Sequence, residues 1–214
     1  MKLSTQAWQE QQAHWPHAGR HILAQFDEDT IVVYQAYRPA IGHYAAEHGK
    51  FGGEFSFDRM SWIKPNFLWM MVRSGWGTKP GQEVSLAIRI RRAGFDQILA
   101  DAVHSTFIPE LHGDERAWKQ AMAGSDVRLQ WDPDHAPGGA KLERRAIQLG
   151  LRGEALRRFA GEWLVEIMDI SGFVAEQRER RGDKLGLVTP RERVLAIGDP
   201  AVVSKLGLAD ASIG

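Results

Sequence analysis

The chain has 214 residues, of which 43% are hydrophobic and 25% are charged, a composition that excludes a disordered or collagen-like protein. Its 27 lysines and arginines balance 27 aspartates and glutamates, so the formal net charge is zero and any anion-binding site must be local. The absence of cysteine excludes disulfides, thiolate metal sites and a cysteine nucleophile.

Targeting and membrane signals are not apparent in the sequence. Residues 1–20 contain no apolar run of the kind found in secretory signals. The longest apolar run, residues 67–72, is too short to cross a bilayer. We therefore expect a soluble, cytoplasmic protein without a membrane partner.

The domain layout follows from length and pattern. Residues 1–19 are rich in Gln and His and show no hydrophobic period, so we expect a loose arm there. One α+β domain is expected over residues 20–198, because this length suits a single core. Residues 199–214 are expected to form a mobile tail.

The first predicted elements are a strand and a helix. The stretch TIVVYQAY at 30–37 is rich in β-branched and aromatic residues and predicts a strand. Pro39 suits a first helical turn and Gly49 suits the residue after a helix, so a helix is predicted between them. The glycine-broken stretch 51–55 predicts a loop.

The next elements are a buried helix and a strand. Residues 65–74 are apolar on nearly every side, which predicts a buried helix ending at Gly75 or Gly77. Residues 83–90 alternate between apolar and polar side chains, as in a half-buried strand. An amphipathic helix is predicted over residues 94–104.

The second half of the chain is less regular. Residues 163–170 fit either a strand or the middle of a helix. The other predicted elements are a short strand entering a loop over 127–139, strands at 146–151 and 191–198, and helices at 154–162 and 172–182. Because strands and helices do not alternate strictly, we expect a single α+β domain with packed helices and a mixed, mainly antiparallel sheet, either continuous or split.

Several common catalytic motifs are missing from the sequence. It contains no phosphate-binding loop of the form G-x-x-x-x-G-K-[ST], no G-x-S-x-G nucleophile elbow and no H-E-x-x-H zinc helix. The commonest nucleotide hydrolases and serine esterases are therefore excluded.

Residues 59–79 hold the densest chemical pattern. They combine three tryptophans spaced seven residues apart with four basic residues: Trp62, Trp69, Trp76, Arg59, Lys64, Arg73 and Lys79. Arg and Lys suit phosphate or carboxylate, and tryptophan rings stack on bases. We expect Trp69 to lie in the core, and Trp62 and Trp76 to stand at a pocket rim. In the alternative, all three rings fill the core and the basic side chains reach outward to water.

The predicted helix that follows Lys64 offers a further anion site. Free backbone N–H groups at a helix N-terminus point outward and favour negative charge. Because Lys64 immediately precedes Pro65, we expect an anion to be held at this helix start. On this hypothesis the helix is core and its flanks form the site.

Polar residues at the end of the first predicted strand are also candidates. Along a strand Gln35 and Tyr37 share one face, and Tyr34 lies on the other. They are either functional or a hydrogen-bonded core pair.

Two further polar groups come later in the chain. Asp132, Asp134 and His135 could hold a metal, but Asp-Pro-Asp is typical of a turn, which is the favoured interpretation. Gln148 is either an amide that orients a substrate or an ordinary polar residue.

The stretches TIVVYQAY, RMSWIKPNFLWMMVRSGW, TKPGQE, LQWDPD and RRAIQLGLRG, in this order, resemble the bacterial and fungal family named "domain of unknown function 4291". The resemblance covers residues 20–198. The order of elements in turn looks like that of the ADP-ribosyltransferase superfamily, which bends a split mixed sheet around NAD. This fold-level analogy implies NAD as the cofactor.

The analogy also implies site residues. A basic residue is expected on the first strand, where this chain has Tyr34 and Gln35, so phosphate would have to be held by Arg59, Lys64 or Arg73. A late Glu or Gln that orients the nucleophile would be Gln148 or Glu166.

Two functional hypotheses follow. The first is an enzyme resembling ADP-ribosyltransferases that holds NAD, or another phosphate-bearing nucleotide, and transfers a glycosyl group, with nucleic acid as one acceptor class. Its catalytic candidates are Gln148, Glu166 and Tyr34, and its cofactor-binding candidates are Gln35, Tyr37, Arg59, Trp62, Lys64, Arg73, Trp76 and Lys79. The second is a non-catalytic module that binds RNA or single-stranded DNA on the same surface. A closed pocket favours the enzyme and an open groove favours the module.

Overall fold

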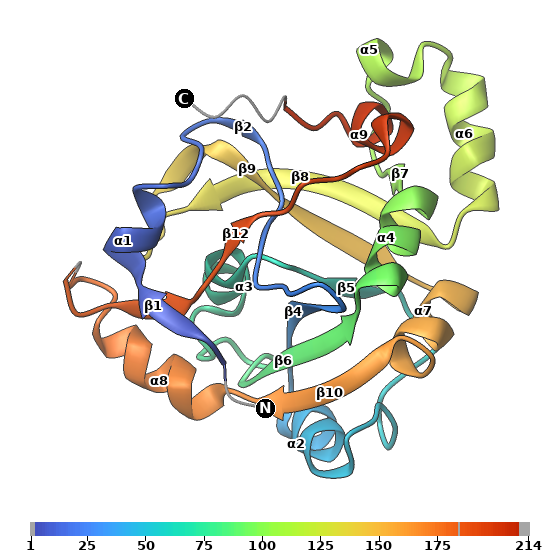
Figure 1. Cartoon of the computed structure of the whole chain (residues 1–214). Coiled ribbons are helices and arrows are strands. Elements are labelled where there is room, and N and C mark those ends of the chain that lie inside the picture. Colours follow the sequence, from blue (N-terminus) through green and yellow to red (C-terminus); the bar gives the residue numbers. More distant parts are fainter. Residues whose placement is uncertain (1–2, 184, 210–214) are drawn as a thin grey trace.

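Two β-sheets form the frame of the computed structural model, which describes residues 3–183 and 185–209 (Figure 1). The smaller sheet has three antiparallel strands, in the order β10 (Leu164–Asp169), β6 (Val84–Arg91) and β4 (Thr30–Tyr37). The larger, mixed sheet has the order β2 (Gly19–Arg20), β9 (Lys141–Leu151), β8 (Val127–His135) and β7 (Val103–His104), and β5 (Ser61–Ile63) also pairs with β9. Both predicted features, mixed strand pairing and an α+β fold, are confirmed.

One backbone bridge joins the two sheets. The Tyr34 N–H donates to the Lys64 carbonyl oxygen at 2.7 Å, and the Lys64 N–H donates to the Tyr34 carbonyl oxygen at 3.2 Å. Because Lys64 directly follows β5, this bridge ties β4 of the smaller sheet to the β5 side of the larger one. The junction fixes the backbone of Lys64 between two sheets.

The smaller sheet is buried on both faces. β4 has the predicted bounds, and its side chains alternate between two apolar clusters, with Val33 in one and Val32 in the other. The prediction that β6 has one solvated face is wrong, because Ser85 and Ala87 are buried as well. Helices α3 (Phe67–Ser74) and α8 (Ser171–Glu179) pack on this second face and exclude water from it.

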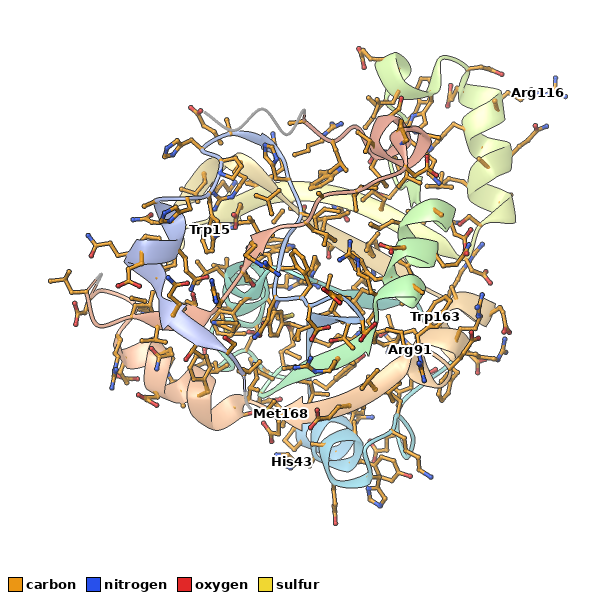
Figure 2. All side chains as sticks on the ribbon, viewed as in Figure 1. Trp15, His43, Arg91, Arg116, Trp163 and Met168 are labelled. Atoms are coloured by element: carbon orange, nitrogen blue, oxygen red, sulfur yellow. The ribbon has the colours of Figure 1, made fainter. Side chains whose placement is uncertain are left out.

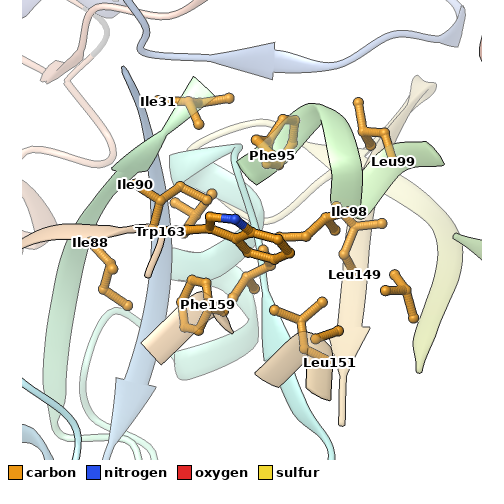
Figure 3. Close-up of a cluster of buried hydrophobic side chains, with 14 of the residues drawn as sticks. Ile31, Ile88, Ile90, Phe95, Ile98, Leu99, Leu149, Leu151, Phe159 and Trp163 are labelled. Carbon is orange, nitrogen blue, oxygen red and sulfur yellow. The ribbon is translucent and has the colours of Figure 1, made fainter. Parts of the chain in front are cut away.

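The main core fills the space between the two sheets. Figure 3 shows Trp163 at the centre of this cluster, surrounded by aliphatic and aromatic side chains from both sheets and from α4 (Arg92–Asp101) and α7 (Gly153–Ala160). The labelled neighbours of Trp163 are Ile31, Ile88, Ile90, Phe95, Ile98, Leu99, Leu149, Leu151 and Phe159. Each is almost completely buried, so this cluster is the main source of hydrophobic stabilisation.

The N-terminal segment is attached to the body, contrary to the predicted loose arm. β1 (Thr5–Ala7) pairs antiparallel with β11 (Val188–Pro190), and α1 (Trp8–Gln12) follows directly. Trp8 and Trp15 are both buried, and the Trp15 indole N–H donates to the Glu192 carbonyl oxygen at 3.1 Å. The sequence pattern misses this because two isolated tryptophans show no period, although together they bury a large apolar area.

The remaining elements lie around this frame (Figure 1). The helix predicted between Pro39 and Gly49 is confirmed as α2 (Pro39–His48), and Gly49 adopts the left-handed conformation that ends it. The other elements are β3 (Leu23–Ala24), β12 (Arg193–Val194), α5 (Pro109–His112), α6 (Glu115–Gly124) and α9 (Pro200–Leu206). In Figure 2, Arg116 on α6 and His43 on α2 point away from the body. No described helix has both the length and the apolar character needed to span a membrane.

Several predicted boundaries differ from the structure. Residues 163–170 contain a strand, β10, because residues 164–169 pair antiparallel with β6. β8 continues through Asp132, Pro133 and Asp134, where a turn had been predicted, since the partner strand β9 extends as far as Lys141. In the predicted tail, residues 200–206 form α9, and residues 210–214 lie outside the described part of the chain.

Gly94→Ala is expected to destabilise the protein by about 1–3 kcal/mol, because overpacking a dense core forces neighbours to move. A Cβ atom at Gly94 would meet the Trp163 ring, with Cδ2 at 2.7 Å. Urea denaturation of the variant measures the change in the free energy of unfolding. Gly124→Ala is the matched control, because nothing lies within 4 Å of a Cβ atom at this helical glycine. An equal loss in both variants would contradict the steric explanation.

Candidate functional site

A cavity of about 1020 Å³ lies beside the junction of the two sheets. Its walls come from the end of β4, the segment that contains β5, helix α3, and the β8–β9 pair. Seven of the eleven candidate site residues line it: Gln35, Tyr37, Arg59, Trp62, Lys64, Arg73 and Gln148. Most of the residues that the sequence singled out therefore lie around one cavity, which is assembled from distant segments.

A hydrogen-bonded group fixes the wall between β4 and β5. The Gln35 side-chain amide donates to the Ser61 hydroxyl at 2.7 Å and to the Trp62 carbonyl oxygen at 3.2 Å. The Tyr37 and Ser61 hydroxyl oxygens are 2.8 Å apart. Gln35 and Tyr37 thus share a face as predicted, and both hold the start of β5 in place.

Lys64 is a buried cation at the cavity wall, with only 4% of the residue exposed. Within the described part of the chain its ammonium group makes no hydrogen bond and no ion pair within 4.0 Å. Burial and, to a smaller extent, the nearby charge of Arg73 lower the pKa of Lys64 to about 8, and Asp132 opposes the shift. This amine therefore changes its charge close to neutral pH.

The cavity carries more positive than negative charge. Four basic residues line it, Arg38, Arg59, Lys64 and Arg73, and two acidic residues, Glu54 and Asp132. Four positive charges less two negative charges leave an excess of two positive charges. Arg38 and Glu54 pair with each other at 2.6 Å. Arg59 and Arg73, like Lys64, have no carboxylate within 4.0 Å in the described residues. In a chain of zero net charge, the cavity is therefore a local region of positive charge.

Two tryptophan rings lie at the cavity. The ring of Trp62 lies over Gly150, where an added Cβ atom would be 3.0 Å from the indole and 2.6 Å from the sulfur of Met60. A glycine is needed there because any side chain would displace that ring. Trp69 stacks on His135, with the rings parallel within 3° and their centres 5.2 Å apart.

Three residues of the tryptophan and basic segment, Trp69, Trp76 and Lys79, lie elsewhere than the sequence predicted. Trp69, predicted as core, lines the cavity, because on α3 it lies one turn before Arg73 on the same helix face. Trp76, predicted at the rim, is buried against Phe67, because the left-handed backbone that ends α3 turns its ring inward. Lys79 is exposed and does not line the cavity.

The predicted anion site at the start of α3 is already filled by the chain itself. The helix begins at Phe67, and the buried Glu192 carboxylate accepts hydrogen bonds from the Phe67 N–H at 2.6 Å and the Asn66 amide at 3.2 Å. Asn66 caps the helix by accepting from the Trp69 N–H at 2.7 Å. Burial raises the pKa of Glu192 well above its ordinary value, Asp134 adds to this, and Arg144 opposes it. The N-terminus of α3 is therefore not open to a ligand anion.

Asp132 is a site residue that the sequence interpretation assigned to a turn. It lies on β8 two residues after Gln130, and both side chains line the cavity together with Gln148 from β9. The Gln148 amide donates to Asp132 Oδ2 at 2.6 Å and to Gln130 Oε1 at 3.2 Å. Burial raises the pKa of Asp132, and the Gln148 hydrogen bond and the Lys64 charge oppose this. The period-2 spacing of Gln130 and Asp132 is the signal that could have revealed a strand here.

The other acidic candidates have different roles. Asp134 is buried in an ion pair with Arg144 at 2.6 Å, so it does not share a site with Asp132. Among the described residues no cluster of three or more His, Asp or Glu could hold a metal ion.

Two predicted catalytic residues lie away from the cavity. Tyr34 is fully buried on the opposite face of β4, edge-on to Phe67 at 5.5 Å. Glu166 lies on β10, which β6 separates from β4. The alternation of side chains along β4 and the strand order of the sheet explain both positions. Of the three catalytic candidates, only Gln148 lines the cavity.

The comparisons with known proteins give one family match. The model of "Domain of unknown function (DUF4291)" matches residues 21–195. A search of curated proteins gives no match to this chain.

Lys64→Met is expected to raise the free energy of unfolding at pH 7 by roughly 1–3 kcal/mol, because it removes a buried cation that has no ion-pair partner. The lowered pKa means that the folded state binds fewer protons than the unfolded state between about pH 8 and pH 10.5. Wild-type stability should therefore rise with pH across this window, and the advantage of the variant should shrink. Urea denaturation at pH 7 and pH 10 measures both effects.

Lys79→Met is the control for this prediction, because Lys79 is exposed. It should change stability by less than about 0.5 kcal/mol at either pH. A Lys64→Met variant that is less stable than the wild type at pH 7 would show that the ammonium is well compensated in the folded protein.

Proposed function

The chain belongs to the DUF4291 family, and we propose that it is an enzyme that binds a phosphate-bearing nucleotide, with NAD as the leading candidate, and transfers its glycosyl group. The nucleotide would occupy the cavity at the sheet junction. One observation carries this proposal: Arg59, Lys64 and Arg73 line a single cavity without carboxylate partners among the described residues.

The buried and unpaired Lys64, beside the charge of Arg73, supports an anionic ligand. Positive charges that converge in a cavity repel one another, and burial of Lys64 adds a desolvation cost. A diphosphate would offset both costs, because arginine binds phosphate oxygens bidentately and lysine adds a point charge. Stability alone gives no reason to bury Lys64, since an apolar residue would pack at that position at lower cost.

The shape of the site favours a small ligand. A volume of about 1020 Å³ is at the upper end of the range of about 300–1,000 Å³ that is usual for small-molecule pockets. Trp62 and Trp69 would offer ring faces for a base or a nicotinamide, since aromatic side chains stack on such rings. A cavity with walls on several sides suits a dinucleotide better than an extended nucleic-acid strand.

Asp132 and Gln148, on the larger sheet, would act at the reacting sugar. Glycosyl transfer passes through a transition state in which positive charge develops on the sugar ring. The Asp132 carboxylate could stabilise that charge, and the Gln148 amide, 2.6 Å from it, would hold it in position. The basic residues would stabilise the diphosphate, in the way that prearranged charges lower a reaction barrier.

Isothermal titration should show that NAD and ADP-ribose bind with micromolar affinity. Arg73→Ala and Trp62→Ala should each weaken binding by roughly tenfold or more, because each removes a contact worth about 1–3 kcal/mol. Lys79→Ala is the matched control, since this exposed lysine does not line the cavity, and its affinity should stay within about twofold of the wild type. Nicotinamide release in the presence of RNA or protein acceptors then tests the transfer step.

Binding of single-stranded RNA alone, weakening steeply with salt, would replace the proposal with a nucleic-acid binding module. Nucleotide binding that survives both cavity substitutions would locate the ligand elsewhere. Nucleotide binding without nicotinamide release would refute the transfer reaction.

The affinity for NAD should fall as the pH rises through about 8, because Lys64 loses its positive charge there. A charge-assisted contact is worth about 1.5–3 kcal/mol, so the loss between pH 7 and pH 9.5 should be roughly tenfold or more. Titrations at both pH values measure this change. The same titrations on Lys64→Met should show weak binding at both, and a fall of equal size in the variant would assign the pH dependence to another group.

A further inference from the structure

We propose that Lys64 is a covalent amine, which condenses with the carbonyl carbon of a phosphate-bearing aldehyde in the cavity to form a Schiff base. This inference rests on the proposed function, because the same basic residues would hold the phosphate. It adds a chemical step and a ligand class, an open-chain sugar phosphate or a similar aldehyde, that nucleotide binding alone does not require.

The position of Lys64 suits a nucleophile. Its backbone is held on both sides, by β5 before it and by the two hydrogen bonds to Tyr34. Its residue is 4% exposed and lines the cavity, and within the described chain its amine has no hydrogen-bond or ion-pair partner. A structural lysine would normally be paired or would extend to water. Here the amine is desolvated beside a second cation, Arg73, which is a recognised way to activate a lysine.

The protonation state of the amine also fits. Only a neutral amine attacks a carbonyl, and an ordinary lysine is neutral in roughly one molecule in 300 at pH 8. Because the pKa of Lys64 is lowered to about 8, about half of the molecules carry a neutral amine at that pH.

Asp132 is the proton acceptor in this step. It lines the same cavity, its charge is felt by Lys64, and it is not within ion-pair distance of the ammonium. Through one bridging water molecule it can accept a proton from the ammonium, after which the amine nitrogen attacks the carbonyl carbon and forms a C–N bond. The proton then returns to the carbinolamine hydroxyl, the C–O bond breaks, and one water leaves. The products are a protonated imine and water, so charge and atoms balance.

The ligand chemistry separates this step from simple nucleotide binding. ADP-ribose has a free anomeric carbon, so its ring opens to an aldehyde. In NAD the same carbon is bonded to nicotinamide, so that ribose ring cannot open to an aldehyde. ADP-ribose can therefore form the adduct, and NAD can bind without forming it.

Reductive trapping tests the proposal directly. The protein is incubated at pH 8 with a stoichiometric amount of pyridoxal 5′-phosphate, a probe with both an aldehyde and a phosphate, and then reduced with borohydride. Intact mass and peptide mapping should show one adduct per chain, at Lys64, formed at least about tenfold faster than at the exposed Lys79. ADP-ribose with cyanoborohydride should label the same residue.

Matched variants test whether Lys64 is the residue that forms the adduct. Lys64→Met should lose the adduct while keeping wild-type far-ultraviolet circular dichroism, and Lys79→Met should keep the adduct. Asp132→Asn should slow adduct formation by roughly tenfold, as expected for a lost proton acceptor. Labelling spread over exposed lysines, or unchanged labelling of Lys64→Met, would overturn the proposal.

The two proposals can fail separately. NAD binding in the calorimeter without any trapped adduct would overturn the covalent step and leave the nucleotide site standing. A Lys64 adduct with pyridoxal 5′-phosphate, without binding of NAD, would support the reactive amine and overturn the choice of NAD.

Discussion

The backbone bridge between Tyr34 and Lys64 is the constraint on which the site depends. It joins β4, at the edge of the smaller sheet, to the residue that directly follows β5 of the larger sheet, so the two sheets meet at this junction. The cavity lies beside this junction and takes side chains from both sheets. Because Lys64 is part of the bridge, its position is set by main-chain hydrogen bonds, which makes it better ordered than a lysine on a loop would be.

Charges inside the molecule are treated in two different ways. Where the chain buries a carboxylate for structure, it supplies partners: Asp134 has Arg144, and Glu192 has the N-terminus of α3. Lys64, which is buried at the cavity wall, has no such partner among the described residues. Buried charge that is not compensated costs stability, so natural proteins retain it mainly where a ligand completes the arrangement. This contrast, within one chain, is the strongest physical argument for a binding site here.

Helix α3 has partners at both of its ends and contributes one of its sides to the cavity. Its N-terminus is closed by Asn66 and Glu192, and its C-terminus by Gly75 in the left-handed conformation. With both ends satisfied, only the side of the helix is available to the cavity, and Trp69 and Arg73 lie there. The opposite side carries Phe67 and Met71 into the second apolar cluster. One short helix thus supports the core and forms a wall of the site.

Local sequence determined the elements with strong patterns and much of the chemistry. The strand at 30–37, the helix closed by Gly49 and the tryptophan and basic segment were all visible, because turn residues and side-chain periods act over a few positions. Tertiary structure decided four other features. They are the burial of both faces of β6, the inward position of the Trp76 ring, the contact of Glu192 with the N-terminus of α3, and the position of Asp132 beside Gln148. Each depends on a partner far away in the chain, and such pairings leave no periodic trace in a single sequence.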